Sequence, residues 1–214
     1  MDTEIKKKDS YIEYNKDNLK EIRKRLKKVL TKDRFEHTLG VAYTAGAMAM
    51  AYEIEPYRAV LAGLLHDCAK CIDDEEKIDL CKKYKLPISE YEYQHPYLLH
   101  AKLGAELARR EYNVSDEEIY WSIYYHTTGT EDMSMLQKII YISDFIEPGR
   151  KPFSELKEIR ACAFSDIDLC MAKILESSIS FLQKKGLNSI EKNTLIAYQY
   201  YKNLIESRDN KNVK

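Results

Sequence analysis

The chain has 214 residues, enough to bury one good core but too few for two comfortable ones, so we expect a single domain. Lys and Arg number 34 against 35 Asp and Glu, and a net charge of -1 gives no general argument for a nucleic-acid partner. The longest apolar run, 59–65, is far shorter than the roughly 18 residues that suggest a membrane span. The first residues also lack the apolar core of a signal peptide, which predicts a cytoplasmic protein with no membrane partner.

Both ends of the chain are polar and weakly periodic, which predicts an N-terminal tail over 1–14 and a C-terminal tail over 206–214. The domain itself is expected over 15–205. It begins with a basic amphipathic stretch at 19–30, which we interpret as an ordinary helix with a solvated face.

Apolar residues then recur at helical spacing in three long stretches, 41–52, 61–68 and 167–182. Residues 73–76 and 115–118 each have the spacing of a capping box, which marks a helix start. Gly129 and Pro148-Gly149 are typical of helix ends. Since no stretch alternates convincingly as a strand, the predicted fold class is all-α.

Cys68 and Cys71 form a CxxC pair within an apparent helix, and no second pair follows at zinc-finger distance. We interpret them as small buried side chains rather than a redox or metal pair. The odd total of five cysteines, in a chain with no export signal, predicts reduced thiols.

The chemistry lies in the middle third of the chain. Four of the five histidines occupy apolar-flanked positions compatible with helices, and two aspartates complete a set. The six residues are His37, His66, Asp67, His100, His126 and Asp144. Imidazoles and carboxylates together suit iron, manganese, cobalt or zinc, and a carboxylate can bridge two ions. The set therefore favours a centre of two transition-metal ions. A single histidine of this kind, taken alone, is more often a satisfied core residue.

His66 and Asp67 are adjacent, about 100° apart around a helix, so both can point into one cleft at different heights. Lys70 follows on the same expected face. Arg34 precedes His37 by three residues, and Arg150 follows the Pro-Gly stop. Three cations beside metal ligands would suit a phosphate ester. The alternative is that they are surface cations on unrelated helices.

The order H…HD…H…H…D resembles the HD-domain superfamily of metal-dependent phosphohydrolases, in the variant that holds two metals. More narrowly, "RFEHTLGVA", "AGLLHDCAK", "LLHAKLGA", "YYHTTG" and "ISDFIEPGR" are similar to the YqeK family of symmetrical bis(5'-nucleosyl)-tetraphosphatases. The resemblance is close over about 34–153 and looser to about 200. It implies an HD-type helical bundle with the dimetal site between helices, covered over the nucleotide pocket by C-terminal helices at about 154–205.

The resemblance also implies roles for individual residues. The first iron site that it implies comprises His37, His66, Asp67 and Asp144. The second implied site comprises His100, His126 and the bridging Asp67. Manganese and cobalt are alternatives to iron. The implied substrate contacts are Arg34, His37, Lys70, His126, Thr127, Asp144 and Arg150. The implied catalytic residues are Asp67, Lys70 and Arg150. One segment departs from the family pattern, because 189–193 replaces the usual His-Pro run, and this puts nucleotide contacts at 186–195 in doubt.

The implied activity is the hydrolysis of dinucleoside tetraphosphates at the central linkage, so that diadenosine tetraphosphate and water give two ADP. Two metals would lower the pKa of a shared water, while Arg34, Lys70 and Arg150 would hold the polyphosphate. The alternatives are an HD phosphohydrolase acting on a deoxynucleotide or a guanosine alarmone, and a non-catalytic nucleotide-sensing module. The intact set of six ligands argues against the module. The 17 tyrosines offer surface for base stacking or for a homodimer contact.

Overall fold

The computed structural model describes residues 16–184, 186 and 190–212. Within these ranges the chain forms eleven α-helices and one 3₁₀ helix, and no strand, which confirms the predicted all-α class. The helices are α1 (Lys16–Val29), α2 (Lys32–Ala51), α3 (Pro56–Leu65), α4 (Asp74–Lys83), α5 (Glu90–Gln94), η1 (Pro96–Leu99), α6 (His100–Glu111), α7 (Glu117–Tyr124), α8 (Met135–Ile146), α9 (Leu156–Cys162), α10 (Ile167–Lys184) and α11 (Lys192–Asn212). No helix in the described ranges has the length and apolar character needed to cross a membrane.

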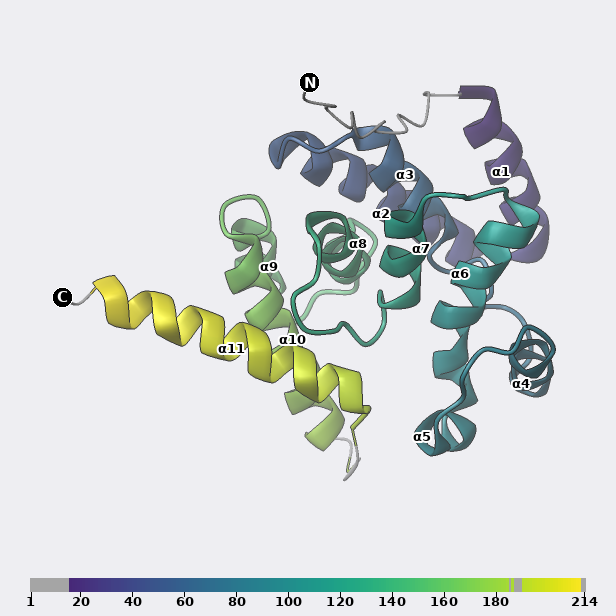
Figure 1. Ribbon diagram of the computed structural model, residues 1–214. Coiled ribbons are helices and arrows are strands. Elements are labelled where there is room, and N and C mark those ends of the chain that lie inside the picture. The colour runs from purple at the N-terminus through teal and green to yellow at the C-terminus, as the bar shows by residue number, and fades with distance from the viewer. Residues whose placement is uncertain (1–15, 185, 187–189, 213–214) are drawn as a thin grey trace, which may run out of the picture.

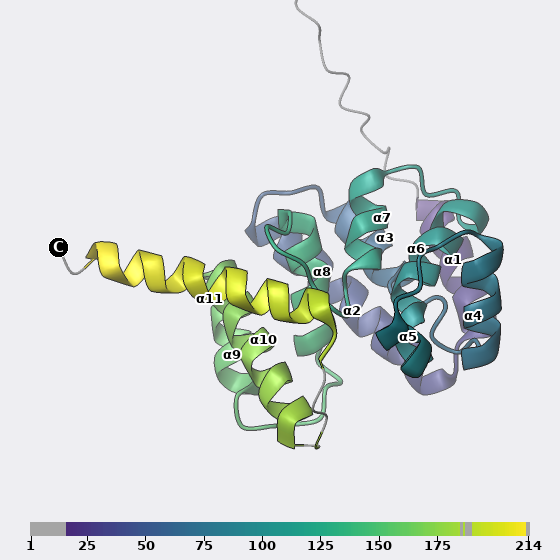
Figure 2. The same cartoon turned by 60° about the horizontal axis from the view of Figure 1, so that its bottom comes forward.

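Helices α2, α3 and α8 pack together in the centre of the molecule (Figure 1). Helices α9, α10 and α11 lie on one side of them, and α1, α4, α5 and α6 lie on the other, as Figure 2 also shows. One buried apolar cluster extends from Leu26 on α1 to Tyr201 on α11. The described helices other than the short α5 therefore share a single core.

The close packing of α2 on α3 depends on Gly63. A Cβ atom on Gly63 would lie 2.7 Å from the Cα atom of Ala42, so only glycine allows the two backbones to approach this closely. Ala42 lies five residues after His37 on α2, and Gly63 lies three residues before His66, the C-cap of α3. This contact therefore sets the separation of two of the predicted ligands.

Two predicted helix starts differ in detail from the structure. Asp73 is the N-cap of α4, but its side chain makes no capping hydrogen bond. The N-cap of α7 is Asp116 rather than Ser115, because the Asp116 carboxylate accepts from the amides of Glu118 and Ile119 and also pairs with Arg58. Capping boxes do form at two other places, the starts of α5 and α8.

Two helices also end earlier in the structure than the sequence predicted. The HD pair does not lie inside a helix, since α3 ends at Leu65 and residues 66–70 form tight turns. Likewise α7 ends at Tyr124, ahead of Gly129, whose φ of 68° falls in the left-handed region that favours glycine. Helix α8 ends at Ile146, with Glu147 as its C-cap directly before Pro148, where the sequence predicted a helix end.

Within the predicted C-terminal tail, residues 206–212 continue α11 to Asn212. Arg208 in this last part of the helix binds Asp166 and Asp168. The predicted N-terminal tail at 1–14 lies outside the described residues. All five cysteines are free; Cys68 is buried as expected, whereas Cys71 is exposed.

Candidate metal centre

The six ligand candidates lie close together in space and come from five parts of the chain, mostly from helix ends. His37 lies in α2, and His66 and Asp67 directly follow α3. His100 is the first residue of α6, His126 follows α7 by two residues, and Asp144 is in the last turn of α8. The structure thus brings together all six residues that the sequence singled out.

Main-chain carbonyls fix the orientation of three of the histidines. The Nδ1 atoms of His66, His100 and His126 lie 2.7, 2.6 and 2.7 Å from the carbonyl oxygens of the residues three positions earlier. Because a carbonyl can only accept, each Nδ1 carries the proton and each Nε2 presents a lone pair. This is the tautomer that binds a metal through Nε2.

Asp67 lies between two groups of these histidines. Its Oδ2 atom is 3.9 Å from His37 Nε2 and 3.3 Å from His66 Nε2. Its Oδ1 atom is 3.2 Å from His100 Nε2 and 3.7 Å from His126 Nε2. Each carboxylate oxygen therefore faces its own pair of imidazoles, which is the geometry that a bridging carboxylate requires.

Asp144 completes the group around Oδ2. Its Oδ1 atom is 3.0 Å from His37 Nε2 and 3.9 Å from His66 Nε2. Three overlapping sets of three ligand atoms, each set within 4.8 Å, can be drawn from the six residues. Both halves of the cluster can therefore hold a cation.

Burial makes this cluster costly unless a cation is present. His66, Asp67, His100 and His126 are all at most 2% exposed. The Nε2 atoms of His37 and His66 and the Oδ1 atom of Asp67 have no hydrogen-bond partner in the described part of the chain. Buried polar atoms are nearly always paired, so unpaired lone pairs aimed at one point fit a metal ion.

The pKa values agree with this interpretation. Burial acts to raise the pKa of Asp67, but the imidazoles of His66, His100 and His126 hold it well below its usual value. Burial lowers the pKa of His100 to about 4. Burial also acts to lower the pKa of His66, but Asp67 and Asp144 outweigh it and raise that pKa. At neutral pH Asp67 is therefore ionised, and His100 is a neutral imidazole.

The predicted cations surround the same cluster. Arg34 Nη1 donates to Asp67 Oδ2 at 2.8 Å, and Arg150 Nη2 donates to Asp144 Oδ1 at 2.7 Å. Lys70 Nζ lies 3.0 Å from His100 Nε2, and its side chain, like those of the two arginines, is about one-third exposed. The three cations belong to one site and are not scattered over unrelated helices.

The hydroxyl of Thr127 joins the second half of the cluster. Its Oγ1 atom lies 3.1 Å from His126 Nε2 and 3.2 Å from His100 Nε2. Thr127 also lines a cavity of about 800 Å³, the larger cavity, which extends from the cluster toward α9, α10 and the start of α11. Thr127 therefore connects this cavity to the ligands through its side chain.

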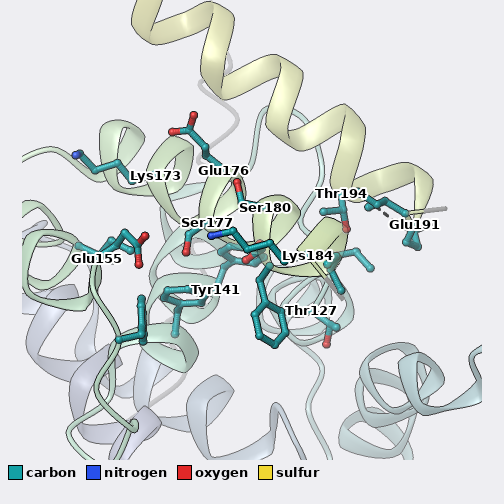
Figure 3. Close-up of a pocket in the computed structure, with 18 of the residues that line it drawn as sticks. Thr127, Tyr141, Glu155, Lys173, Glu176, Ser177, Ser180, Lys184, Glu191 and Thr194 are labelled. Atoms are coloured by element: carbon teal, nitrogen blue, oxygen red, sulfur yellow. Dashed lines mark hydrogen bonds between the residues drawn. The ribbon is translucent and has the colours of Figure 1, made fainter. Parts of the chain in front are cut away.

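The larger cavity combines aromatic rings with carboxylates and hydroxyls (Figure 3). Tyr141 on α8, Glu155 directly before α9, Glu176 on α10 and Thr194 on α11 all line it. Glu191, in the segment that departs from the family pattern, also lines it. Positions 187–189 of that segment lie outside the described residues.

A smaller cavity of about 600 Å³ lies next to Arg34, His37 and Arg150. Phe145 and Phe153 line both cavities, and their rings meet edge to face with centroids 5.4 Å apart. Apart from Glu147 and Asp33, the charged residues of the smaller cavity are cations. The cluster thus borders two cavities of different character.

Sequence reasoning missed one residue that touches the site, Glu147. Its Oε1 atom is 3.0 Å from His37 Nδ1, and the residue is only 3% exposed. Its position three residues after Asp144 was the only signal available. By sequence alone, this position indicates only the end of a helix before proline.

Residues 34–149 match the HD domain family, and the chain belongs to this family of metal-dependent hydrolases, whose members bind divalent ions. Among its relatives, a protein of Bacillus subtilis (strain 168) named "Bis(5'-nucleosyl)-tetraphosphatase, symmetrical" is 34% identical over 175 residues, 82% of this chain and 92% of the relative. A protein of the same name from Halalkalibacterium halodurans is 37% identical over 169 residues, 79% of this chain and 89% of the relative.

A solved structure from Clostridium acetobutylicum has a similar fold. It is described as a "predicted HD superfamily hydrolase involved in NAD metabolism". The TM-score is 0.82 and the identity 36%, over 86% of this chain and 96% of the other. The resemblance indicated by the five sequence motifs is thereby confirmed at the level of the family.

Proposed function

We propose that this protein hydrolyses dinucleoside tetraphosphates at the central phosphoanhydride bond, converting diadenosine tetraphosphate and water into two ADP. The observation that carries the proposal is the placement of Asp67, with one oxygen facing each pair of histidines. The names of the relatives from Bacillus subtilis and Halalkalibacterium halodurans support the choice of substrate.

We propose two ions, held by the six ligands in the arrangement that the family resemblance implies. His37, His66, Asp67 and Asp144 would hold the first, and Asp67, His100 and His126 the second. When bound, such ions supply Lewis-acid activation of water and of phosphate oxygens at neutral pH. Iron is our choice for the metal, and manganese and cobalt are the substitutes to test.

The chain's own residues would position the substrate. A tetraphosphate carries several negative charges, and Arg34, Lys70 and Arg150 lie where they can exchange their present carboxylate and imidazole partners for phosphate oxygens. The rings of Phe145 and Phe153, shared by the two cavities, would lie beside the phosphate chain. The two halves of the substrate would then extend to either side of the cluster.

Each cavity suits part of such a substrate. The larger one offers Tyr141, Phe145 and several carboxylates and hydroxyls, which match the stacking and hydrogen-bonding needs of a nucleoside. The smaller one offers Arg34, Arg150 and Lys151, which match phosphates. A cytoplasmic location, a homodimer and the absence of a nucleic-acid partner remain predictions.

The proposal is tested by metal reconstitution and a comparison of substrates. Protein treated with a chelator is given Fe²⁺ without oxygen, Mn²⁺ or Co²⁺, and then diadenosine tetraphosphate, a deoxynucleoside triphosphate or a guanosine alarmone. We expect the dinucleotide to be turned over fastest, with no turnover by Asp67→Ala. Turnover of a mononucleotide or alarmone alone would contradict the proposed substrate, and a folded wild type that is inactive on all three would favour the nucleotide-sensing module.

A further inference from the structure

A buried carboxylate outside the six ligands contacts the cluster. Glu147 directly follows α8 and is 3% exposed. Its Oε1 atom is 3.0 Å from His37 Nδ1, and its Oε2 atom accepts a 2.5 Å hydrogen bond from the amide of Gly149. Both carboxylate oxygens therefore have assigned partners, on α2 and in the turn after α8.

His37 differs in this respect from the other three candidate histidines. Those three place Nδ1 against a neutral main-chain carbonyl of their own segment. His37 places it against an ionisable carboxylate from a distant part of the chain. A carboxylate is the stronger acceptor, and a histidine that donates to one is a more basic and better oriented metal ligand.

The chain leaves room for this carboxylate at Gly40. A Cβ atom on Gly40 would lie 2.5 Å from Glu147 Oε2 and 3.2 Å from its Cδ atom. Gly40 is three residues after His37, on the same side of α2. A larger residue at position 40 would force the carboxylate away from its two partners.

The main chain of Glu147 is held just as firmly. Its carbonyl oxygen accepts from the amide of Arg150 at 3.1 Å and from Arg160 Nη2 at 2.7 Å. Asp144 lies one helical turn earlier, and Arg150 lies at the end of the same turn. Glu147 thus connects His37 on α2 with the turn that carries Arg150.

We propose that Glu147 is a positioning residue of the metal centre. Through its side chain it fixes the proton on His37 Nδ1 and the orientation of that ring, and it holds the 147–150 turn against α2. The inference rests on the ligand set proposed above. It adds that one of the two ions depends on a carboxylate that does not touch it.

The test measures metal affinity in the absence of substrate. Wild type, Glu147→Gln and Glu147→Ala are titrated with Co²⁺ against a competing chelator. We expect two ions to bind wild type, and Glu147→Ala to bind one of them about 10- to 100-fold more weakly. Glu147→Gln should lie in between, because His37 and Gly149 face different carboxylate oxygens and glutamine replaces one of the two with an NH₂ group, which cannot accept.

Two matched variants keep the test independent of folding. Gly40→Ala retains the charge of Glu147 but displaces it, so it should weaken the same ion. Gly46→Ala adds the same methyl group to the same helix, 2.8 Å from Val60 Cγ2 and away from the carboxylate, and should not change metal affinity. Glu92→Gln alters another buried carboxylate, which pairs with Lys102, and should lower stability alone.

A spectroscopic readout follows the histidine itself. In the Co²⁺-loaded protein, the exchangeable Nδ1–H signal of His37 should be visible by proton NMR and should be lost in Glu147→Ala. Wild-type affinity for both ions in Glu147→Ala and Gly40→Ala would overturn the inference, as would an equal loss in Glu92→Gln. A wild type that binds no Co²⁺ would instead overturn the proposed metal centre.

Discussion

At the scale of single residues, Asp67 is the ligand candidate whose carboxylate faces the most imidazoles. The four imidazoles nearest to its oxygens lie 3.2–3.9 Å away. An Nε2 atom that presents a lone pair cannot donate a hydrogen bond to a carboxylate oxygen, because both atoms are then acceptors. Arg34 alone supplies a short ion pair, at 2.8 Å. The side chain is therefore built to face positive charge on both of its oxygens.

Removing this carboxylate should affect both ions, whereas removing a terminal imidazole should affect one. We expect Asp67→Ala to lower the metal content from about two ions per chain to nearly none, and His126→Ala to leave about one. Elemental analysis of folded protein, with folding checked by circular dichroism, measures this difference. Retention of both ions by Asp67→Ala would show that it does not bridge.

The cations should behave in the opposite way. Lys70→Ala and Arg150→Ala are expected to keep the metal content while lowering kcat/KM for the tetraphosphate by about 10²-fold, because each removes a charge aimed at phosphate. Lys83→Ala, which changes an exposed lysine on α4, serves as the control. If either site variant instead loses metal or unfolds, its residue has a structural role.

The six ligand candidates and the three cations could be predicted from sequence because histidine is rare in this chain and the motifs occur in order. Glu147 could not be predicted in the same way. The chain has 35 acidic residues, and a glutamate before proline carries no periodic signal. Its role depends on α2 packing against the 147–150 turn, which only the folded chain shows.

At the scale of elements, helix ends supply the acceptors that orient the ligands. Helix α3 ends at Leu65, after which the amides of Cys68 and Lys70 bond back three residues, to Leu65 and Asp67. The last carbonyls of a helix lack intrahelical partners, and His66 takes the one at Gly63. The sequence predicted a helix here, but it could not show that the helix tightens at the ligand pair.

The start of α7 offers a direct test of such a boundary. Asp116 accepts from two amides and from Arg58 at 2.7 and 2.8 Å, so Asp116→Ala should lower the free energy of unfolding by about 2 kcal/mol. Ser115→Ala, at the residue that the sequence favoured, should change it little. Urea unfolding of both variants measures the difference, and a larger effect at Ser115 would restore the original prediction.

The same residue has a defined pH dependence. Burial acts to raise the pKa of Asp116, but the hydrogen bonds from Arg58 and the α7 amides outweigh it and depress the folded pKa. Its stabilisation is therefore present above the unfolded pKa of about 3.9 and is lost as the pH falls through the lower folded value. The difference in stability between wild type and Asp116→Ala should shrink over that acidic range.

At the scale of the whole molecule, the helical class and single core follow from length and periodicity. The reach of α11 does not, because 206–212 is polar and reads as a tail. Its anchors are tertiary: Arg208 binds Asp166 and Asp168, and the buried Tyr201 hydroxyl accepts from the amide of Met133. These contacts hold α11 where its first turn lines the larger cavity (Figure 3).

Our central claim is that the bond broken is the middle one of the three phosphoanhydride linkages of the tetraphosphate, and it rests on the placement of Asp67 between the histidine pairs and on the names of the relatives. A short incubation of metal-loaded protein with diadenosine tetraphosphate, separated by anion-exchange chromatography, shows this directly. Central cleavage predicts ADP as the only nucleotide product from the earliest time point. AMP and ATP in equal amounts would contradict it, because they require attack at a phosphorus next to one end of the chain.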